Sequence, residues 1–218
     1  MNYPLIVPIK GFIIIVTREY ILTEDFFNQP EESSVEQPKT ESKFKSFIKE
    51  IFQTLLLALI FYFIIDSFFP RVRVENISMK PTLQPGELLL VNKLAYKLGE
   101  PHNGDVIVFH YPGNPAEDYI KRLIGLPGDM VRVEGGMVYI NGQPVDEPYI
   151  ADSPNYRGEW EVPIGEYFVL GDNRNQSSDS HSWGFVPEEN IVGKALVVYW
   201  PIEQIKSLTY PLVVNAAN

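Results

Sequence analysis

The stretch DYIKRLIGLPGDMVRVEGGMVYINGQPV, residues 118–145, consists of short apolar runs separated by glycine and proline. Such runs between turn-forming residues are typical of β-strands, and VEGGMVYING within the stretch has the pattern of a hairpin. The same character is found in ELLLVNK (87–93), GDVIVFHYP (104–112), GEYFVLGD (165–172) and NIVGKALVVYWP (190–201). No helical period of useful length is present after residue 75. We therefore predict a mainly β domain over residues 70–218.

A long apolar run, IFQTLLLALIFYFIIDSFF at residues 51–69, precedes this domain. It carries a single charge, Asp66, and a helix of this length extends about 28 Å, the thickness of one hydrocarbon core. The absence of a polar face argues against a buried helix of a soluble protein. The run also lies too far from the N-terminus, and lacks a small-residue cleavage site, to be a signal peptide. We predict one transmembrane helix.

Residues 1–50 are predicted to be a cytoplasmic N-terminal segment, because slightly more lysines precede the apolar run than basic residues follow it. A shorter apolar stretch, LIVPIKGFIIIV at residues 5–16, is interrupted by proline, lysine and glycine and is too short to span. It is either an interfacial segment or the result of a translation start placed too far upstream. NQPEESSVEQPKTES, residues 28–42, is predicted to be a flexible linker. The β domain would then lie on the extracytoplasmic face of the cytoplasmic membrane.

Composition excludes several classes of function. A net charge of −10 argues against nucleic acid as a partner, because binding to phosphates depends on clustered lysine and arginine. The sequence has no zinc-type spacing of cysteine and histidine and no glycine loop for phosphate. Cysteine is absent, which excludes disulfides and thiol catalysis. Serine hydroxyls remain among the candidate nucleophiles.

Ser78 is such a candidate, in ENISMKPTLQPGELLLVNK at residues 75–93, and it would need a base. Histidine is the usual base, and a triad of Ser78 with His110 or His181 and with Asp179 is conceivable. The third histidine, His102, lies in an expected surface loop. Nothing in the sequence brings the members of this triad together.

Lys121 is the other candidate base. On a strand its side chain shares a face with Tyr119 and Leu123, and burial of that face would lower the pKa of the lysine. A neutral amine can then accept the proton of a serine. The alternative is a lysine at a sheet edge that extends outward beside Arg122, and composition alone favours this alternative.

Four segments occur in a specific order behind the apolar run: SMKPTL with PGELLLVNK (78–93), GDVIVFHYP (104–112), DYIKRLIGLPGD (118–129) and GDNRNQSSDSHSWGFVP (171–187). Together they resemble the conserved boxes of the type I signal peptidases, membrane-bound endopeptidases that use a serine and a lysine. The resemblance extends from about residue 43 to residue 201. It implies that Ser78 is the nucleophile and Lys121 the general base, with no metal or organic cofactor.

The resemblance also implies supporting roles near this pair. Ser177 matches a serine that orients the lysine amine by a hydrogen bond. Asp172, Arg174 and Asp179 match charged positions that hold the last box beside the pair. Without the resemblance, Arg174 and Asp179 would be interpreted as an ordinary surface pair. Asn76 stands where family members have serine or glycine, and whether its amide binds the oxyanion is left open.

The implied substrates are secretory precursor proteins with small residues at the first and third positions before the cut. Residues at the matching pocket positions are Val74, Met79, Leu83, Tyr119 and Ile120. The lipid bilayer is the second expected partner, with Phe68, Phe69 and Val72 close to it. The segment between Lys121 and Gly171 has room for a hairpin and a loop, PNYRGEWEVP, which predicts a compact form of the fold.

Three alternatives compete with this interpretation. A non-catalytic, membrane-tethered β module that binds exported peptides would keep the groove but lack Ser78 or Lys121, and both are present. A self-cleaving regulator of the repressor type would carry an Ala-Gly or Cys-Gly site ahead of the serine, and neither dipeptide occurs there. A Ser-His-Asp hydrolase is the remaining enzymatic alternative.

Overall fold

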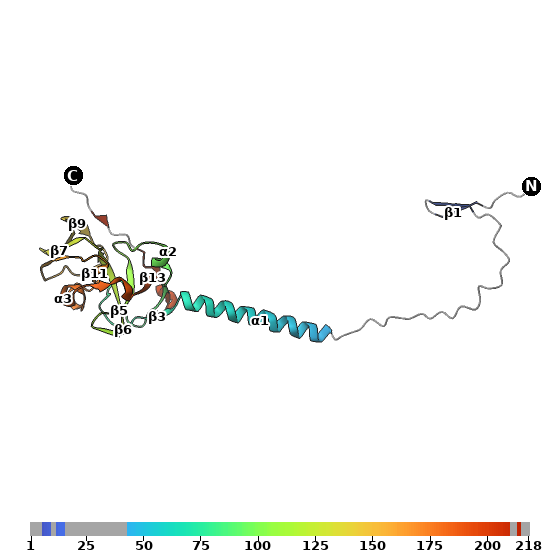
Figure 1. The fold of residues 1–218 in the computed structure, drawn as a ribbon, viewed down its shortest axis with the longest axis horizontal. Helices are drawn as coiled ribbons and strands as arrows, with labels where there is room; N and C mark the ends of the chain where they lie inside the picture. Colours follow the sequence, from blue (N-terminus) through green and yellow to red (C-terminus); the bar gives the residue numbers. More distant parts are fainter. Residues whose placement is uncertain (1–5, 10–11, 16–42, 210–212, 215–218) are drawn as a thin grey trace, which may run out of the picture. The chain divides into compact units, whose positions relative to one another are not determined.

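The computed structural model of the chain describes residues 6–9, 12–15, 43–209 and 213–214 (Figure 1). The chain divides into two units, residues 1–50 and 51–218. In the first unit, strands β1 (Ile6–Ile9) and β2 (Phe12–Ile15) pair in antiparallel orientation. The expected linker at residues 28–42 lies outside the described residues, as do residues 5, 10, 11 and 16 of the N-terminal apolar stretch.

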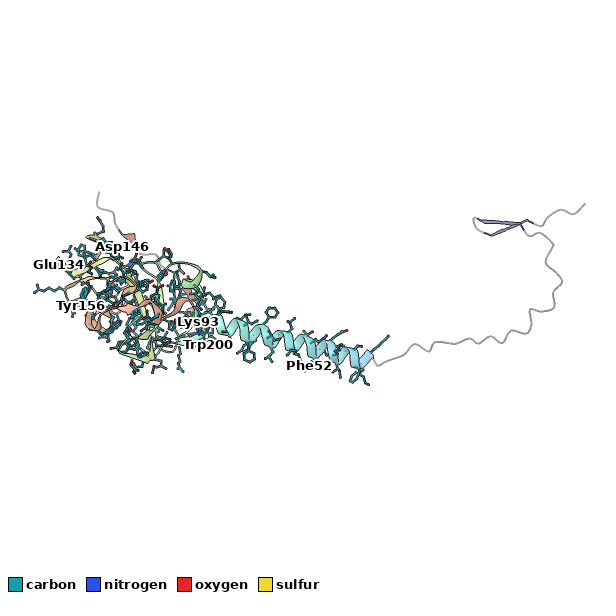
Figure 2. All side chains as sticks on the ribbon, viewed as in Figure 1. Phe52, Lys93, Glu134, Asp146, Tyr156 and Trp200 are labelled. Carbon is teal, nitrogen blue, oxygen red and sulfur yellow. The ribbon has the colours of Figure 1, made fainter. Side chains whose placement is uncertain are left out.

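Helix α1 (Lys43–Phe68) contains almost all of the apolar run and begins eight residues before it. None of its residues is buried within the chain, and Phe52, labelled on this helix in Figure 2, is 64% exposed. Within the described part of the chain, it is the one helix long and apolar enough to cross a membrane. Asp66, the single charge of the run, accepts a hydrogen bond of 2.7 Å from Arg71, which follows the helix. The only charge of the run is therefore paired, and its other residues carry no charge.

The larger sheet has eight strands, all paired in antiparallel orientation. Its main path runs through β12 (Val186–Pro187), β11 (Glu166–Leu170), β6 (Asn114–Gly125), β5 (Val106–Tyr111), β13 (Ile191–Trp200), β4 (Leu88–Asn92) and β3 (Arg71–Arg73), and β14 (Lys206–Ser207) pairs with β13. Strands predicted from the apolar runs are all present here or in the smaller sheet. The predicted mainly β fold behind an apolar helix is thereby confirmed.

The smaller sheet has five strands, in the order β10 (Gly158–Glu161), β7 (Met130–Glu134), β8 (Met137–Ile140), β9 (Gln143–Asp146) and β15 (Val213–Val214). The hairpin predicted in VEGGMVYING is confirmed as β7 and β8, joined by Gly135 and Gly136, which both adopt positive φ. The loop predicted over PNYRGEWEVP is wrong in part, because GEWE forms β10. A single apolar residue, Trp160, gives no visible alternation, and pairing with β7 supplies the strand geometry.

Strand β6 contributes to all three hydrophobic clusters of the core. Ile124 packs with the valines of the smaller sheet, and Leu123 packs with Phe109 and Val169. Ile120 lies against the third cluster, which includes Val74, Met79 and Leu83. Because side chains alternate along a strand, these contacts fix the direction in which every residue of β6 points.

Helices after α1 are short. They are α2 (Ala95–Leu98), α3 (Ser180–Trp183) and the 3₁₀ turns η2 (Arg174–Gln176), η3 (Glu188–Asn190) and η4 (Ile202–Gln204). One helical turn is too short to produce a periodic pattern, so the sequence gives no signal for them.

Candidate active site

The structure brings Ser78 and Lys121 together. Ser78 lies in the turns that follow β3, and Lys121 lies in the middle of β6. The Nζ atom of Lys121 is 2.9 Å from Oγ of Ser78 and 3.2 Å from the carbonyl oxygen of Ile120. A hydroxyl and an amine at this distance can exchange a proton directly.

Lys121 is buried, with 4% of its surface exposed. The expectation of an outward-extending lysine is therefore wrong, although β6 pairs with β11 only over residues 122–125 and its edge at Lys121 is unpaired. Its Nζ lies 5.0 Å from the ring centre of Tyr119, as the predicted shared face requires. Burial lowers the pKa of Lys121 to about 8, because the ammonium form loses hydration, while the negative charges of Asp179 and Asp172 act in the opposite direction.

Asp172 connects the strand of the lysine to the loop of the serine. Its carboxylate is fully buried and accepts hydrogen bonds from Nε and Nη2 of Arg122, at 2.8 and 2.6 Å. It also accepts a hydrogen bond of 2.5 Å from Oγ1 of Thr82. Arg122 follows Lys121 in β6, and Thr82 follows Ser78 by four residues. One carboxylate therefore joins both sides of the site.

Asn173 was not among the predicted residues, yet it contacts the backbone of the nucleophile. Its backbone N–H donates to the carbonyl of Ser78 at 3.0 Å, and its side-chain amide donates to the carbonyl of Ile77 at 3.2 Å. The sequence places Asn173 in the last box but gives no sign of which backbone it meets.

Arg174 and Asp179 do not form the surface pair that the sequence alone would suggest. Both are buried, and each has another partner. Nη1 and Nη2 of Arg174 donate to the carboxylate of Glu147 at 2.6 and 2.5 Å. Asp179 accepts hydrogen bonds from the backbone N–H of Gly171 at 2.9 Å and from the backbone N–H of His181 at the start of α3. Glu147 was missed because an isolated glutamate after a strand carries no local signal.

Ser177 lies beside the nucleophile loop without the hydrogen bond implied by the resemblance. Its buried Oγ has no hydrogen-bond partner among the described residues, and Lys121 bonds to Ser78 and Ile120 instead. A side chain at Gly171 would collide with Ser177 and with the carbonyl of Ser78. Glycine at this position therefore allows the loop to approach the nucleophile.

The histidines do not reach Ser78 in this structure. His110 pairs with Asp118 at 2.7 Å on the exposed end of the β5–β6 hairpin. His181 pairs with Asp179 at 2.5 Å and stacks on Tyr156. A His-Asp pair therefore exists, but the group at hydrogen-bonding distance from the serine hydroxyl is the lysine amine.

A cleft of about 620 Å³ opens over Ser78 and Lys121. It is lined by residues 72–79 and 116–121 together with Gln176 and Ser178. Of the predicted pocket residues, Val74, Met79, Tyr119 and Ile120 line the cleft, as does Asn76. The prediction for Leu83 is wrong, because its side chain is fully buried in the core and does not line the cleft. Within the described ranges, no cluster of histidine and acidic side chains suitable for a metal ion is present.

Replacing Asp172 with asparagine is expected to destabilise the β domain strongly. Arg122 would keep its charge at a site with no solvent exposure, so we expect the free energy of unfolding to fall by about 3–5 kcal/mol. Chemical denaturation of the full chain in detergent, followed by circular dichroism, measures this change. Asp146→Asn, at an exposed position of β9, is the matched control. Equal unfolding midpoints for the two variants would contradict the prediction.

The fold and the buried serine–lysine contact define a candidate hydrolytic site behind an apolar helix, and comparison with known proteins supplies the family. Residues 45–200 match the family described as "Signal peptidase, peptidase S26". The chain belongs to this family, which confirms the resemblance found in the sequence, and it is therefore a peptidase.

Two relatives illustrate the similarity. Signal peptidase I of Leptolyngbya laminosa is 44% identical over 191 residues, covering 84% of this chain and 92% of the relative. Probable signal peptidase I-2 of Synechocystis sp. (strain ATCC 27184 / PCC 6803 / Kazusa) is 43% identical over 178 residues, covering 78% and 82%. A solved signal peptidase I from Enterococcus faecalis V583 is 35% identical, with a TM-score of 0.42, and the match covers 44% of this chain and 97% of that one.

Proposed function

We propose that this chain is a membrane-anchored serine endopeptidase that removes N-terminal signal peptides from exported precursor proteins, using Ser78 and Lys121. The observation that carries the proposal is the 2.9 Å contact between the lysine amine and the serine hydroxyl at the base of a cleft. Membership of the signal peptidase family supports the class of substrate.

The reaction begins when neutral Lys121 takes the proton of the Ser78 hydroxyl and Oγ attacks the carbonyl carbon of the scissile peptide bond. The lysine then gives the proton to the departing amine, which leaves an acyl-enzyme ester on Ser78. Water attacks the ester by the same route, with Lys121 again acting as the base. A pKa of about 8 gives the amine a substantial neutral fraction near neutral pH.

The tetrahedral intermediate needs hydrogen-bond donors for its oxyanion. The backbone N–H of Ser78 has no acceptor within the described part of the chain, so it is free to donate. Asn76 lines the same cleft, and its amide is our candidate for a second donor. Asn173 and Asp179 hold the surrounding backbone, and Asp172 holds the side chains of Thr82 and Arg122, through the contacts described above.

An extended substrate would add to the free edge of β6. This strand pairs with β5 along most of its length, but it pairs with β11 only over residues 122–125. Residues 116–121 therefore present an unpaired edge to the cleft, which suits main-chain hydrogen bonding to a peptide. Because side chains of a bound strand alternate, the first and third residues before the cut would point into the apolar side of the cleft, next to Val74, Met79 and Ile120.

The anchor places this site at the surface where precursors emerge. We assign residues 1–50 to the cytoplasmic side, residues 51–69 to the single membrane span and residues 70–218 to an extracytoplasmic catalytic domain at the cytoplasmic membrane. The support for this assignment is the unburied, apolar surface of α1, which needs an apolar environment outside the chain.

Cleavage of a defined precursor tests the proposal. Detergent-solubilised full-length protein is mixed with a precursor that carries an Ala-x-Ala site, and mass spectrometry identifies the cut. We expect cleavage after the second alanine, and a precursor with phenylalanine at that position should be cut at least about 100-fold more slowly. Binding of the precursor without cleavage would favour the peptide-binding module instead.

A further inference from the structure

Residues 147–149, which follow β9 of the smaller sheet, contact two buried arginines, Arg122 in β6 and Arg174 in η2. The guanidinium carbon of Arg122 is 3.8 Å from the ring centre of Tyr149, and that of Arg174 is 6.0 Å away. The hydroxyl of Tyr149 donates to Glu147 at 2.6 Å, and Glu147 accepts both bonds of the Arg174 fork. Glu147 and Tyr149 therefore form one unit, which we call the brace.

The brace is linked to both sides of the proposed dyad, through one residue on the lysine side and through Arg174 and the loop of residues 171–173 on the serine side. On the lysine side, Arg122 is the next residue of β6 after Lys121. On the serine side, Nε of Arg174 donates to the carbonyl of Gly171 at 3.1 Å. The loop fixed in this way carries Asn173, whose N–H holds the carbonyl of Ser78.

The charges of this region balance within the protein. Arg122, Arg174 and Asp172 have side chains with no exposed surface, and the side chain of Glu147 is 5% exposed. Two positive and two negative groups therefore pair with one another. Burial and the nearby carboxylate hold the pKa of Tyr149 above its usual range, so its hydroxyl remains a donor. Removal of the Glu147 charge would leave Arg174 buried and unpaired, a costly state that the loop would relieve by moving.

We propose that Glu147 and Tyr149 are positioning residues, which hold Ser78 and Lys121 at reacting distance by fixing Arg174 and Arg122. This inference rests on the proposed function, and it assigns a catalytic consequence to the smaller sheet. The brace touches neither the cleft nor the reacting atoms. Its loss should therefore disturb the chemical step and leave substrate binding intact.

The test compares Glu147→Gln with wild type, using the full chain in detergent and the Ala-x-Ala precursor. Rates are measured at a temperature at which circular dichroism shows both proteins fully folded. We expect kcat to fall by about 30-fold while KM stays within about twofold, because small misplacements of reacting groups act on the chemical step. The pH midpoint of the rate should stay in place, since the brace does not itself exchange the proton.

Asp105→Asn is the matched control. Asp105 is also buried and paired, with Lys194 at 2.5 Å and the Tyr96 hydroxyl at 2.9 Å, but it lies outside the site. This variant should lose comparable stability and keep kcat within about twofold of wild type. An equal loss of kcat in both variants would mean that the brace affects activity only through the stability of the fold. That result would overturn the inference.

Tyr149→Phe keeps the ring under Arg122 and removes only the bond to Glu147, so it tests the inference if Glu147→Gln fails to fold. We expect kcat to fall by roughly three- to tenfold in this variant. The positioning role would be overturned if Glu147→Gln and Tyr149→Phe fold and have the same kcat as wild type. It would also be overturned if only KM changes. If wild type itself cuts no precursor, the proposed function fails instead, and the two failures are thereby distinguished.

Discussion

Lys121→Met is expected to lower kcat for an Ala-x-Ala precursor by roughly 10⁴-fold. Methionine preserves the length and the apolar character of the side chain but has no amine to accept the serine proton. The hydroxyl of Ser78 would keep its position, held through the contacts of Asn173 to its backbone, yet it would lack a base. Cleavage is followed by mass spectrometry under conditions of excess enzyme, so that slow residual activity is detected.

The same variant should be more stable than wild type below pH 8. The pKa of Lys121 is lowered from 10.5 to about 8 on folding, so below pH 8 the folded state holds a buried ammonium that the unfolded state hydrates. This cost is present below the folded pKa and disappears as pH rises from about 8 to 10.5. Its removal by methionine should add about 1–3 kcal/mol to the free energy of unfolding at pH 6.

A stable but inactive variant separates catalysis from folding, and Lys93→Met serves as the control. Lys93 is an exposed lysine that follows β4 and does not line the cleft, so its replacement should leave cleavage unchanged. Equal cleavage by Lys121→Met and wild type would remove the lysine from the mechanism. The His181–Asp179 pair would then be the next base to test.

The strands of this fold were predictable because apolar runs and turn residues are local signals. Strand β6 illustrates a property that these local signals do not predict. Its alternation places Lys121 on the face of Tyr119 and Leu123, but the sequence does not say whether the strand is central or at an edge. Pairing with β5, and with β11 over residues 122–125, decides this, and β11 begins more than 40 residues later in the chain. Burial of the lysine, and with it the lowered pKa, is therefore a tertiary property.

The supporting residues divide in the same way. Asp172 and Asp179 stand out as charges in a recognisable box, and the resemblance assigned them to the loop beside the pair. Glu147 and Asn173 have ordinary neighbours, and their partners, Arg174 and the Ser78 carbonyl, are defined only once the chain is folded. The strand β10 was missed for a related reason, since its pairing with β7 outweighs the weak strand tendency of GEWE.

The rate of cleavage should rise with pH and level off above about pH 8. Only the neutral amine of Lys121 accepts the serine proton, and below its pKa the neutral fraction falls tenfold for each pH unit. With a pKa of about 8, we expect kcat/KM at pH 5 to be roughly 10³-fold below the plateau. A precursor without ionisable side chains near the cut, assayed from pH 5 to pH 9.5, reports the pKa of the free enzyme.

Asp179→Asn supplies a directional check on this profile. The negative charge of Asp179 raises the pKa of Lys121 against the larger, opposite effect of burial. Its removal should therefore move the midpoint to lower pH, and removal of a charge on the exposed rim, as in Glu75→Gln, should move it less, because water screens that position. A midpoint near 6.5 is typical of histidine and would contradict a lysine base. A midpoint near pH 8 that moves to lower pH in Asp179→Asn would identify the buried amine as the group that titrates.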